Sequence, residues 1–173
     1  MSFQITEAVE ILDRTPAVMD ALLRGRSPIW LHCRKGPSAF SPLDVLGHLI
    51  WGEMTDWIPR VRMIVEYQET KAFEPFDRFG FQHVLAGKRV EEILDQFAKL
   101  RGNSLHALHD LGIGEQQLEL RGLHPELGAV TLRNLIATWA VHDLGHIAQV
   151  QAAMASEYKD AVGPWKQYLT ILE

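Results

Sequence analysis

Two histidines stand four positions apart in an otherwise apolar stretch, WAVHDLGHIAQ, near the end of the sequence. Four residues are just over one helical turn, so on a helix the rings of His142 and His146 point to the same side. Apolar residues recur around them in steps of three and four, which predicts that both rings lie in a buried seam. A buried polar group without a partner costs roughly 2–7 kcal/mol. The pair therefore indicates either hydrogen-bonded core histidines or two ligands of one metal ion.

A third histidine favours the metal interpretation. His48 lies in SPLDVLGHLIWGE, about two turns into the helix expected to begin at Ser41. Three imidazole ligands with an open position for water are typical of a catalytic zinc site rather than a closed structural one. Such sites form in bundle cores, where facing helices bring side chains together. We therefore predict that His48, His142 and His146 hold one divalent metal ion.

Two further residues could take part in chemistry at this site. HDLGH is similar to the H-E-x-x-H motif of zinc proteases, with Asp143 in place of the glutamate that acts as general base. Because aspartate is one methylene shorter, an orienting hydrogen bond to a ligand histidine, or a structural role, is favoured over a general base. Cys33, the one cysteine, could be a fourth ligand, but its position in a loop beside Arg34 and Lys35 favours an ordinary thiol.

The other five histidines have plainer explanations. His106 and His109 lie near the end of a predicted helix, where positive charge suits the helix dipole. His32, His83 and His124 fall in predicted loops, and the proline after His124 is typical of a turn. No Glu-x-x-His unit occurs, which argues against a di-iron carboxylate site.

Four amphipathic segments are expected to position these side chains. The second segment has the clearest start, because SPLD combines a serine N-cap, a proline at the first helical position and an acidic partner three residues after the serine. Residues 113–130 fit a short hairpin as well as a loop. We predict an all-α fold, a four-helix bundle with room for a short β-hairpin before the last main helix. The segments are 3–24 with a break or kink at Pro16, 42 to about 67 with a kink at Pro59, 88–110, and 132–156 capped by Thr131.

Two stretches lack a clean periodicity. Residues 68–87 form a long connection, and such connections in compact domains often line or cover a site. We therefore expect substrate to enter beside them. The tail, residues 158–173, is aromatic and is expected to pack back on the bundle.

Length and charge exclude several classes of protein. The 173 residues suit a single domain, residues 1–173, with a full hydrophobic core. A net charge of −5 without a run of Lys and Arg disfavours nucleic-acid binding. No apolar run is long enough for a membrane span, and the first residues lack the features of a signal peptide. A single cysteine permits no internal disulfide and fits a reducing cytosol, so we expect a cytoplasmic protein.

Two stretches together resemble one known family. SPLDVLGHLIWGE and HPELGAVTLRNLIATWAVHDLGHIAQ are similar to motifs of the DinB-like (YfiT-like) family of metal-dependent enzymes, and the resemblance covers nearly the whole chain. It implies a four-helix bundle with His48, His142 and His146 as the metal triad. It also implies an open pocket for the metal, which is often nickel or zinc. Characterised relatives include transferases and isomerases that use low-molecular-weight thiols such as mycothiol, bacillithiol or glutathione, and dimers are common.

Three functions remain open from the sequence. The first is a thiol-dependent S-transferase or isomerase, in which the metal lowers the pKa of a bound thiol and a small electrophile is the second substrate. The second is a metal-dependent hydrolase, with water as the nucleophile. The third is a non-catalytic dimeric helical module in which the metal holds two helices together. The resemblance favours a homodimer in each case.

Overall fold

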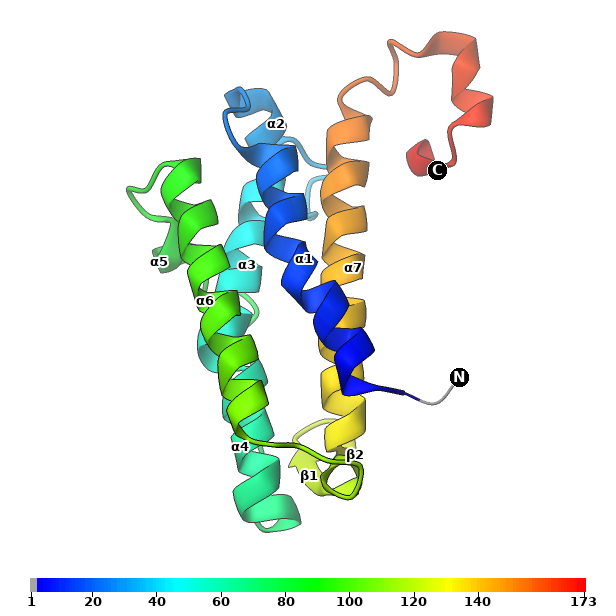
Figure 1. Cartoon of the computed structure of the whole chain (residues 1–173). Helices are drawn as coiled ribbons and strands as arrows, with labels where there is room; N and C mark the ends of the chain where they lie inside the picture. The colour runs from blue at the N-terminus through cyan, green and yellow to red at the C-terminus, as the bar shows by residue number, and fades with distance from the viewer. Residues whose placement is uncertain (1–2) are drawn as a thin grey trace.

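A computed structural model describes residues 3–173 and shows four long helices, closed at one end by a small hairpin (Figure 1). This confirms the predicted all-α four-helix bundle; the first two residues of the predicted domain lie outside the described residues. No helix in the described part of the chain is long and apolar enough to span a membrane. The bundle consists of α1 (Ile5–Leu23), α3 (Pro42–Thr55) followed by α4 (Trp57–Tyr67), α6 (Val90–Asp110) and α7 (Leu132–Ser156). The short segments are α2 (Pro28–His32), α5 (Gln82–Leu85), η1 (Gln68–Thr70), η2 (Gln117–Glu119), η3 (Gly163–Tyr168) and η4 (Thr170–Leu172).

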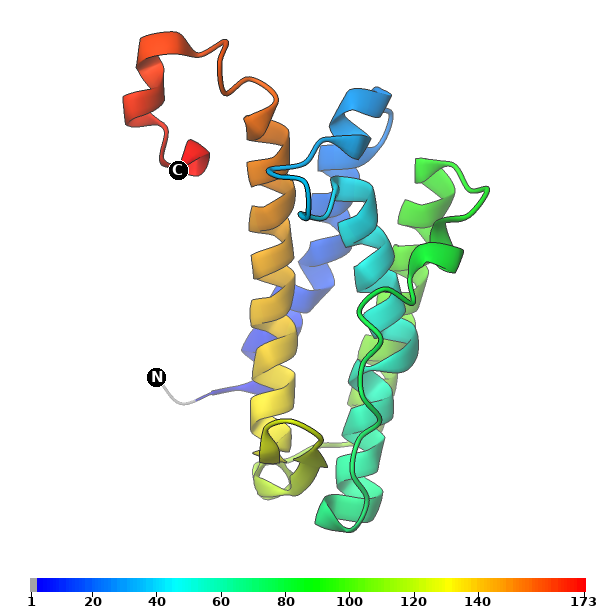
Figure 2. The ribbon, with the colours of Figure 1, turned by 180° about the vertical axis from the view of Figure 1, so that it is seen from behind.

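The helices are not arranged in chain order. Helix α1 packs against α6 and α7, and α3 packs against the same two helices, so α1 and α3 are diagonal to each other. Helices α1 and α7 run in one direction, whereas α3, α4 and α6 run in the other (Figures 1 and 2). Helices α3 and α7, which carry the predicted ligands, are therefore antiparallel neighbours.

Both ligand-bearing helices begin at reciprocal caps. At the start of α3, Ser41 Oγ accepts a hydrogen bond from the Asp44 amide at 3.1 Å, and Asp44 Oδ2 accepts from the Ser41 amide at 2.9 Å. At the start of α7, Thr131 Oγ1 and the side chain of Asn134 make the equivalent pair at 3.1 and 3.0 Å. These bonds satisfy amides that have no partner within the helix. The starts predicted at Ser41 and Thr131 are confirmed.

Pro59 interrupts its helix, but earlier than the position of the predicted kink. Helix α3 ends at Thr55, and the backbone of Asp56 has φ −116° and ψ −68° before α4 begins. Pro59 has no amide hydrogen to offer to the Thr55 carbonyl, and its ring crowds that carbonyl. The break therefore falls four residues before the proline rather than at it.

Pro16 does not break α1, which continues through it to Leu23. The proline leaves the carbonyl of Leu12 without its usual partner four residues along the helix. Nη1 of Arg101, on α6, donates to that carbonyl at 2.7 Å. A side chain from another helix thus replaces the missing backbone hydrogen bond, and of the break or kink expected at Pro16 the break does not occur.

A two-stranded antiparallel hairpin precedes α7, as the sequence allowed. Strands β1 (Arg121–His124) and β2 (Gly128–Thr131) pair with His124 opposite Gly128. Gly128 has φ +72°, a conformation that glycine adopts at little cost. Nδ1 of His124 accepts hydrogen bonds from two amides of the turn at 3.2 Å, so this histidine stabilises the turn.

The connection over residues 68–87 runs along the outside of α3 and α4 (Figure 2). Several hydrogen bonds fix it to the hairpin and the bundle, and Arg60 of α4 donates one of them to the Glu74 carbonyl at 3.3 Å. The Phe73 amide donates to the Leu123 carbonyl of the hairpin at 2.9 Å, and Trp51 Nε1 donates to the Asp77 carbonyl at 3.0 Å. The middle of this connection is thereby held beside α3.

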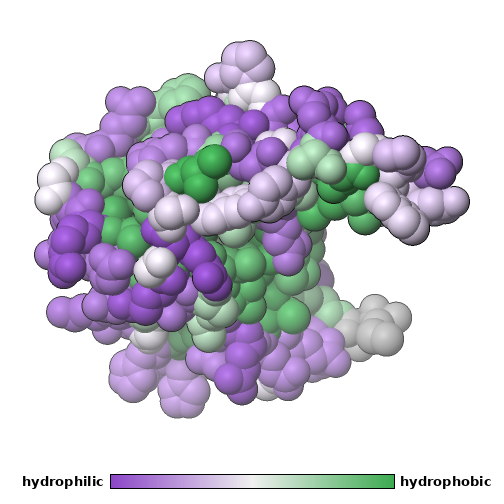
Figure 3. Space-filling model, turned by 90° about the horizontal axis from the view of Figure 1, so that it is seen from above, coloured by the Kyte–Doolittle hydropathy of each residue, from purple (hydrophilic) through white to green (hydrophobic). Residues whose placement is uncertain are grey.

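The aromatic tail contacts the rest of the chain at its two ends but not in its middle, which corrects the expectation for residues 158–173: Tyr158 lies 5.3 Å from Trp30 of α2, between ring centroids. Trp165 and Tyr168 are 70% and 71% exposed, whereas Leu172 is buried against α7. Helix α7 ends at Ser156, and a series of turns leads to Gly163, whose φ of +53° precedes Pro164 at the start of η3. Viewed from this end of the bundle, apolar residues remain visible beside the tail (Figure 3).

The core consists of two apolar clusters with a polar layer between them. One cluster surrounds Trp57 and Trp139, towards the hairpin. The other surrounds Leu46 and Val150, towards α2. In α1, α6 and α7 the buried polar residues fall between the members of the two clusters, whereas on α3 His48 lies among the residues of the second cluster. The buried polar residues between the clusters are Thr15, Glu53, Asp56, Arg101, Ser104 and Asp143.

Candidate metal centre

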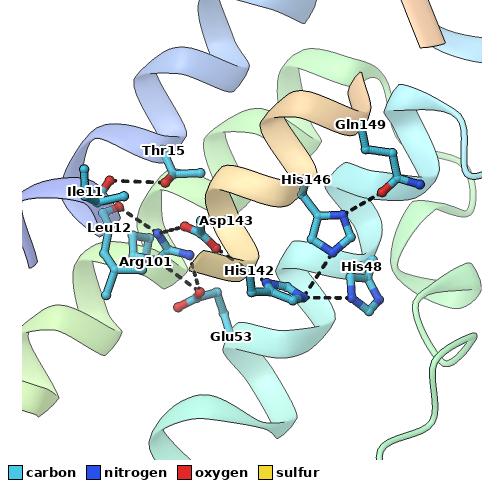
Figure 4. Close-up of polar contacts among 10 residues, drawn as sticks. All are labelled: Ile11, Leu12, Thr15, His48, Glu53, Arg101, His142, Asp143, His146 and Gln149. Carbon is cyan, nitrogen blue, oxygen red and sulfur yellow. Dashed lines mark hydrogen bonds and ion pairs between the residues drawn. The ribbon is translucent and has the colours of Figure 1, made fainter. Parts of the chain in front are cut away.

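The rings of His48, from α3, and of His142 and His146, from α7, meet between these two helices (Figure 4). Nε2 of His142 lies 3.2 Å from Nε2 of His48 and 3.0 Å from Nε2 of His146. Two nitrogens that share an ion through bonds of roughly 2.0–2.1 Å, at right to tetrahedral angles, are about 3.0–3.4 Å apart. Within residues 3–173, these three side chains form the one cluster of histidine, cysteine and acidic groups positioned to share an ion.

The outer nitrogens of two of the rings face oxygen atoms. Nδ1 of His146 lies 2.9 Å from Oε1 of Gln149, and Nδ1 of His142 lies 3.7 Å from Oδ1 of Asp143. At His146 the hydrogen bond to Gln149 holds the proton on Nδ1 and leaves the lone pair on Nε2, whereas the longer contact of His142 places a negative charge beside its Nδ1. Lone pairs directed at one point repel each other unless a cation lies between them. The residues therefore fit a divalent ion.

The surroundings of the triad keep two of its rings neutral. Burial, followed by the neighbouring imidazoles, lowers the pKa of His48 from 6.5 to about 3. Burial and His142 lower the pKa of His146 from 6.5 to about 4. Because an imidazole must lose its proton to bind a metal, both nitrogens are available at neutral pH.

A buried ion cluster lies behind His142 (Figure 4). Arg101 donates to Oε1 of Glu53 at 3.0 and 2.7 Å, and to Oδ2 of Asp143 at 2.6 Å. The three side chains are at most 1% exposed. Together with its bond to the Leu12 carbonyl, this guanidinium joins α1, α3, α6 and α7.

The charge of Asp143 favours a cation at the triad. Burial alone would raise the pKa of this carboxyl, but its contacts with His142 and Arg101 outweigh burial and hold the pKa below its usual value. Asp143 is therefore ionised directly behind a candidate ligand. A carboxylate in that position orients the ring and increases its basicity as a ligand.

The triad lines a cavity of about 340 Å³. This volume is near the lower end of the range for small-molecule sites, roughly 300–1,000 Å³. Phe76 and Arg78 of the 68–87 connection contribute to its wall, which confirms that this connection lines the site. The remaining lining residues come from α3, α4 and the segment before α3: Phe40, Gly52, Asp56, Trp57 and Arg60.

Asp143 occupies a different position from the one that the seam pattern suggested. It is completely buried, whereas His142 and His146 are half-buried at the edge of the core. The face of α7 that is buried in the core therefore includes Asp143. The two rings lie at the edge of that face, beside the cavity rather than beside packed side chains. Asp143 does not line the cavity, and this placement favours an orienting role over that of a general base.

The other candidate residues lie apart from the triad. Cys33 is a buried free thiol whose Sγ lies 3.4 Å from the Trp30 carbonyl. His106 and His109 have exposed side chains near Asp110, at the end of α6. These positions agree with the ordinary roles predicted for them.

The sequence analysis missed Glu53 and Arg101. Both fall on the apolar stripe of their helices, Glu53 between Ile50 and Trp57, and Arg101 between Phe97 and Leu108. A charged residue at a core position is rare unless it is paired. That pattern could have identified the two residues as candidates, although it could not have shown that they pair with each other.

Comparison with known proteins identifies the family. Residues 11–150 match the family model described as the DinB superfamily. The chain belongs to the DinB superfamily. No curated protein matches the sequence of this DinB chain.

Two solved structures share the fold of this DinB-superfamily chain. YfiT from Bacillus subtilis, described as a probable metal-dependent hydrolase with an unusual four-helix bundle topology, is 20% identical, with a TM-score of 0.74. That match covers 94% of this chain and 90% of YfiT. TT2238, a four-helix bundle protein, is also 20% identical, with a TM-score of 0.57 over 86% of this chain and 99% of its own. At this identity the two matches establish the fold.

Proposed function

We propose that this chain is a metal-dependent enzyme that acts on a small molecule, with one divalent ion, zinc or nickel, held by His48, His142 and His146. The observation that carries the proposal is the convergence of their Nε2 atoms, with separations of 3.0 and 3.2 Å, in the wall of a cavity. Three protein ligands leave part of the coordination sphere for a substrate. A metal that only held helices together would be enclosed by four.

The first candidate reaction is thiol transfer or isomerisation. A divalent ion held by His48, His142 and His146 would lower the pKa of a thiol or a water molecule that enters the cavity. Asp143 and Gln149 hold the ligand rings, and the aromatic wall excludes water. Asp56, the one carboxylate among the described lining residues, is paired with Arg60 at 2.7 Å. A thiol of lowered pKa releases its proton to solvent and needs no protein base. Because the cavity offers no unpaired carboxylate from the described part of the chain, the thiol-dependent reaction is favoured.

The second candidate reaction is hydrolysis, with water as the nucleophile. Two observations support it. The structurally similar YfiT is described as a probable metal-dependent hydrolase. Burial raises the pKa of Asp56, which would suit this carboxylate to accept a proton in the cavity. Asp56→Asn would then slow hydrolysis while leaving the metal content unchanged.

The test begins with elemental analysis of protein purified without added metal, alongside His48→Gln as the variant that lacks one ligand. We expect about one ion per wild-type chain and much less in the variant; equal contents would contradict the site. The loaded protein is then assayed with glutathione, bacillithiol and mycothiol against monochlorobimane, and with simple esters in the absence of thiol. Conjugation supports the transferase, and ester hydrolysis alone supports the hydrolase. Full metal occupancy without turnover in either assay would contradict both reactions.

A further inference from the structure

Arg78 stands out among the residues that line the cavity. It is exposed, and no carboxylate in residues 3–173 forms an ion pair with it. Its guanidinium carbon lies 5.1 Å from the centroid of the Phe40 ring. The stacked guanidinium therefore has its hydrogen-bond donors free for a ligand.

This positive charge lies close to the triad. The Phe40 ring on which Arg78 stacks is 5.6 Å from the His48 ring, between centroids. Phe76 lies 5.5 Å from the same imidazole. One aromatic ring thus lies between the guanidinium and a candidate ligand.

The cavity has a positive character although the chain carries a net charge of −5. Arg60 and Asp56 form an ion pair at 2.7 Å, and Arg60 also donates to the Glu74 carbonyl at 3.3 Å, so this pair adds no net charge. Arg78 remains as an unneutralised cation, and an ion at the triad would add to it. A cleft with one sign of charge concentrates ligands of the other sign. A guanidinium binds a carboxylate or phosphate through two parallel hydrogen bonds.

We propose that Arg78 binds an anionic group, a carboxylate or a phosphate, on the substrate of this enzyme. Phe40 and Phe76 contact the apolar part of the same molecule, which places its reacting group beside the triad. The inference rests on the proposed function and narrows its substrate to small organic anions. It assigns Arg78 a role in substrate binding that neither the motifs nor the fold indicated.

The experiment compares three probes of similar shape and different charge: benzoate, phenyl phosphate and neutral benzamide. Calorimetric titration of metal-loaded protein should show at least one anion binding about tenfold or more tightly than benzamide, as expected for hydrogen bonds to a charged group. Arg78→Gln should remove most of that preference and leave benzamide binding unchanged. Arg78→Lys should lie between the two, because lysine keeps the charge but not the paired donors.

Arg62→Gln is the matched control. Arg62 is also exposed and without an ion-pair partner among residues 3–173, but it lies on α4 away from this cavity. We expect no change in anion binding for it. An equal loss of anion binding in both variants would overturn the proposal, because net charge would then select the anion. An anion preference that survives Arg78→Gln would also overturn it, because the ion itself would then select the anion. The proposal would fail as well if the anions bound no more tightly than benzamide.

Metal content, measured first for every variant, separates this inference from the proposed function. Arg78 is not a candidate ligand, so Arg78→Gln should retain the wild-type content. If wild-type protein bound no metal, the proposed function would fail. The probe series on metal-free protein would still test Arg78, because the guanidinium and the aromatic wall do not depend on an ion. A preference for anions abolished by Arg78→Gln would then support the binding role alone.

Discussion

Asp143 contacts two groups with different consequences: Nδ1 of His142 at 3.7 Å and Arg101 at 2.6 Å. Asp143→Asn removes the charge but keeps the shape. Arg101 remains paired with Glu53, so we expect only a small loss in the free energy of unfolding. Metal affinity should fall by about 10–100-fold, as is typical when a group that orients a ligand is changed. Competition with a chromophoric chelator measures it, and unchanged affinity would show that Asp143 does not support the ligand.

Removal of the Arg101 side chain is more costly than neutralisation of Asp143. It leaves two buried carboxylates, those of Glu53 and Asp143, without their shared positive partner. We expect Arg101→Met to lower the free energy of unfolding by about 3–5 kcal/mol, the usual effect of removing one partner from a buried ion pair. Urea denaturation measures the loss. Arg62→Met, at an exposed position, should change it by less than about 0.5 kcal/mol. Similar values for the two variants would mean that the buried cluster does not stabilise the fold.

The low pKa values of His48 and His146 make the metal-free protein sensitive to acid. Their pKa is about 3 and about 4 in the folded chain, against 6.5 when unperturbed. Between these limits the unfolded chain binds more protons, so the free energy of unfolding falls as the pH falls below about 6.5.

The buried carboxyls of Glu53 and Asp56 act in the opposite direction, because burial raises their pKa. The contribution of His48 is therefore best measured by comparing the pH dependence of unfolding in the wild type with that in a variant that lacks this ring. We expect the urea midpoint of metal-free protein to drop from about pH 7 to pH 4.5 more steeply in the wild type than in His48→Gln. Parallel curves would show that the pKa of His48 is not depressed in the folded chain.

At the scale of elements, the start of α3 determines where His48 lies along the bundle. Ser41→Ala removes the Oγ that accepts from the Asp44 amide at 3.1 Å. The expected loss in the free energy of unfolding is about 1 kcal/mol, the usual value for an N-cap. Ser38→Ala, in the exposed loop before α3, should have almost no effect. Equal midpoints in urea for the two variants would contradict the role of the cap.

The sequence predicted those elements whose causes are local. Ser41 and Thr131 mark helix starts through bonds to residues three positions away. The hairpin depends on a turn at His124 and Gly128, and the long α7 depends on its own apolar stripe. The effects of the prolines were harder to place. The consequence of Pro16 depends on Arg101, which is distant in the sequence and supplies the missing donor to α1.

The parts of the site that the sequence did not predict depend on contacts between helices. The closeness of the three histidines could be predicted because two of them lie on one helix and the third follows a clear cap, and their role as metal ligands stays a prediction. Glu53, Arg101 and Arg78 come from different segments and acquire a role only when those segments meet. Apolar periodicity shows which face of a helix is buried but not which helix covers it.

At the scale of the whole molecule, the helix order brings α3 beside α7 and α6 beside α3. The candidate metal site joins α3 to α7, while Arg101 joins all four bundle helices at the same level. Two apolar clusters lie on either side of this layer. The bundle is therefore held together by contacts that do not need an ion.

This arrangement predicts how the molecule responds to removal of metal, and the response separates an enzyme from a metal-stabilised module. After chelation we expect the far-ultraviolet circular dichroism to keep its helical form and unfolding to remain cooperative. The melting temperature should fall by an amount that depends on the logarithm of the free metal concentration, as for any ligand that binds the folded state. In His48→Gln, chelation should leave the melting temperature unchanged. Loss of helical structure on chelation of the wild type would instead favour the module, because the ion would then be supplying the folding free energy that the two clusters and Arg101 are expected to provide.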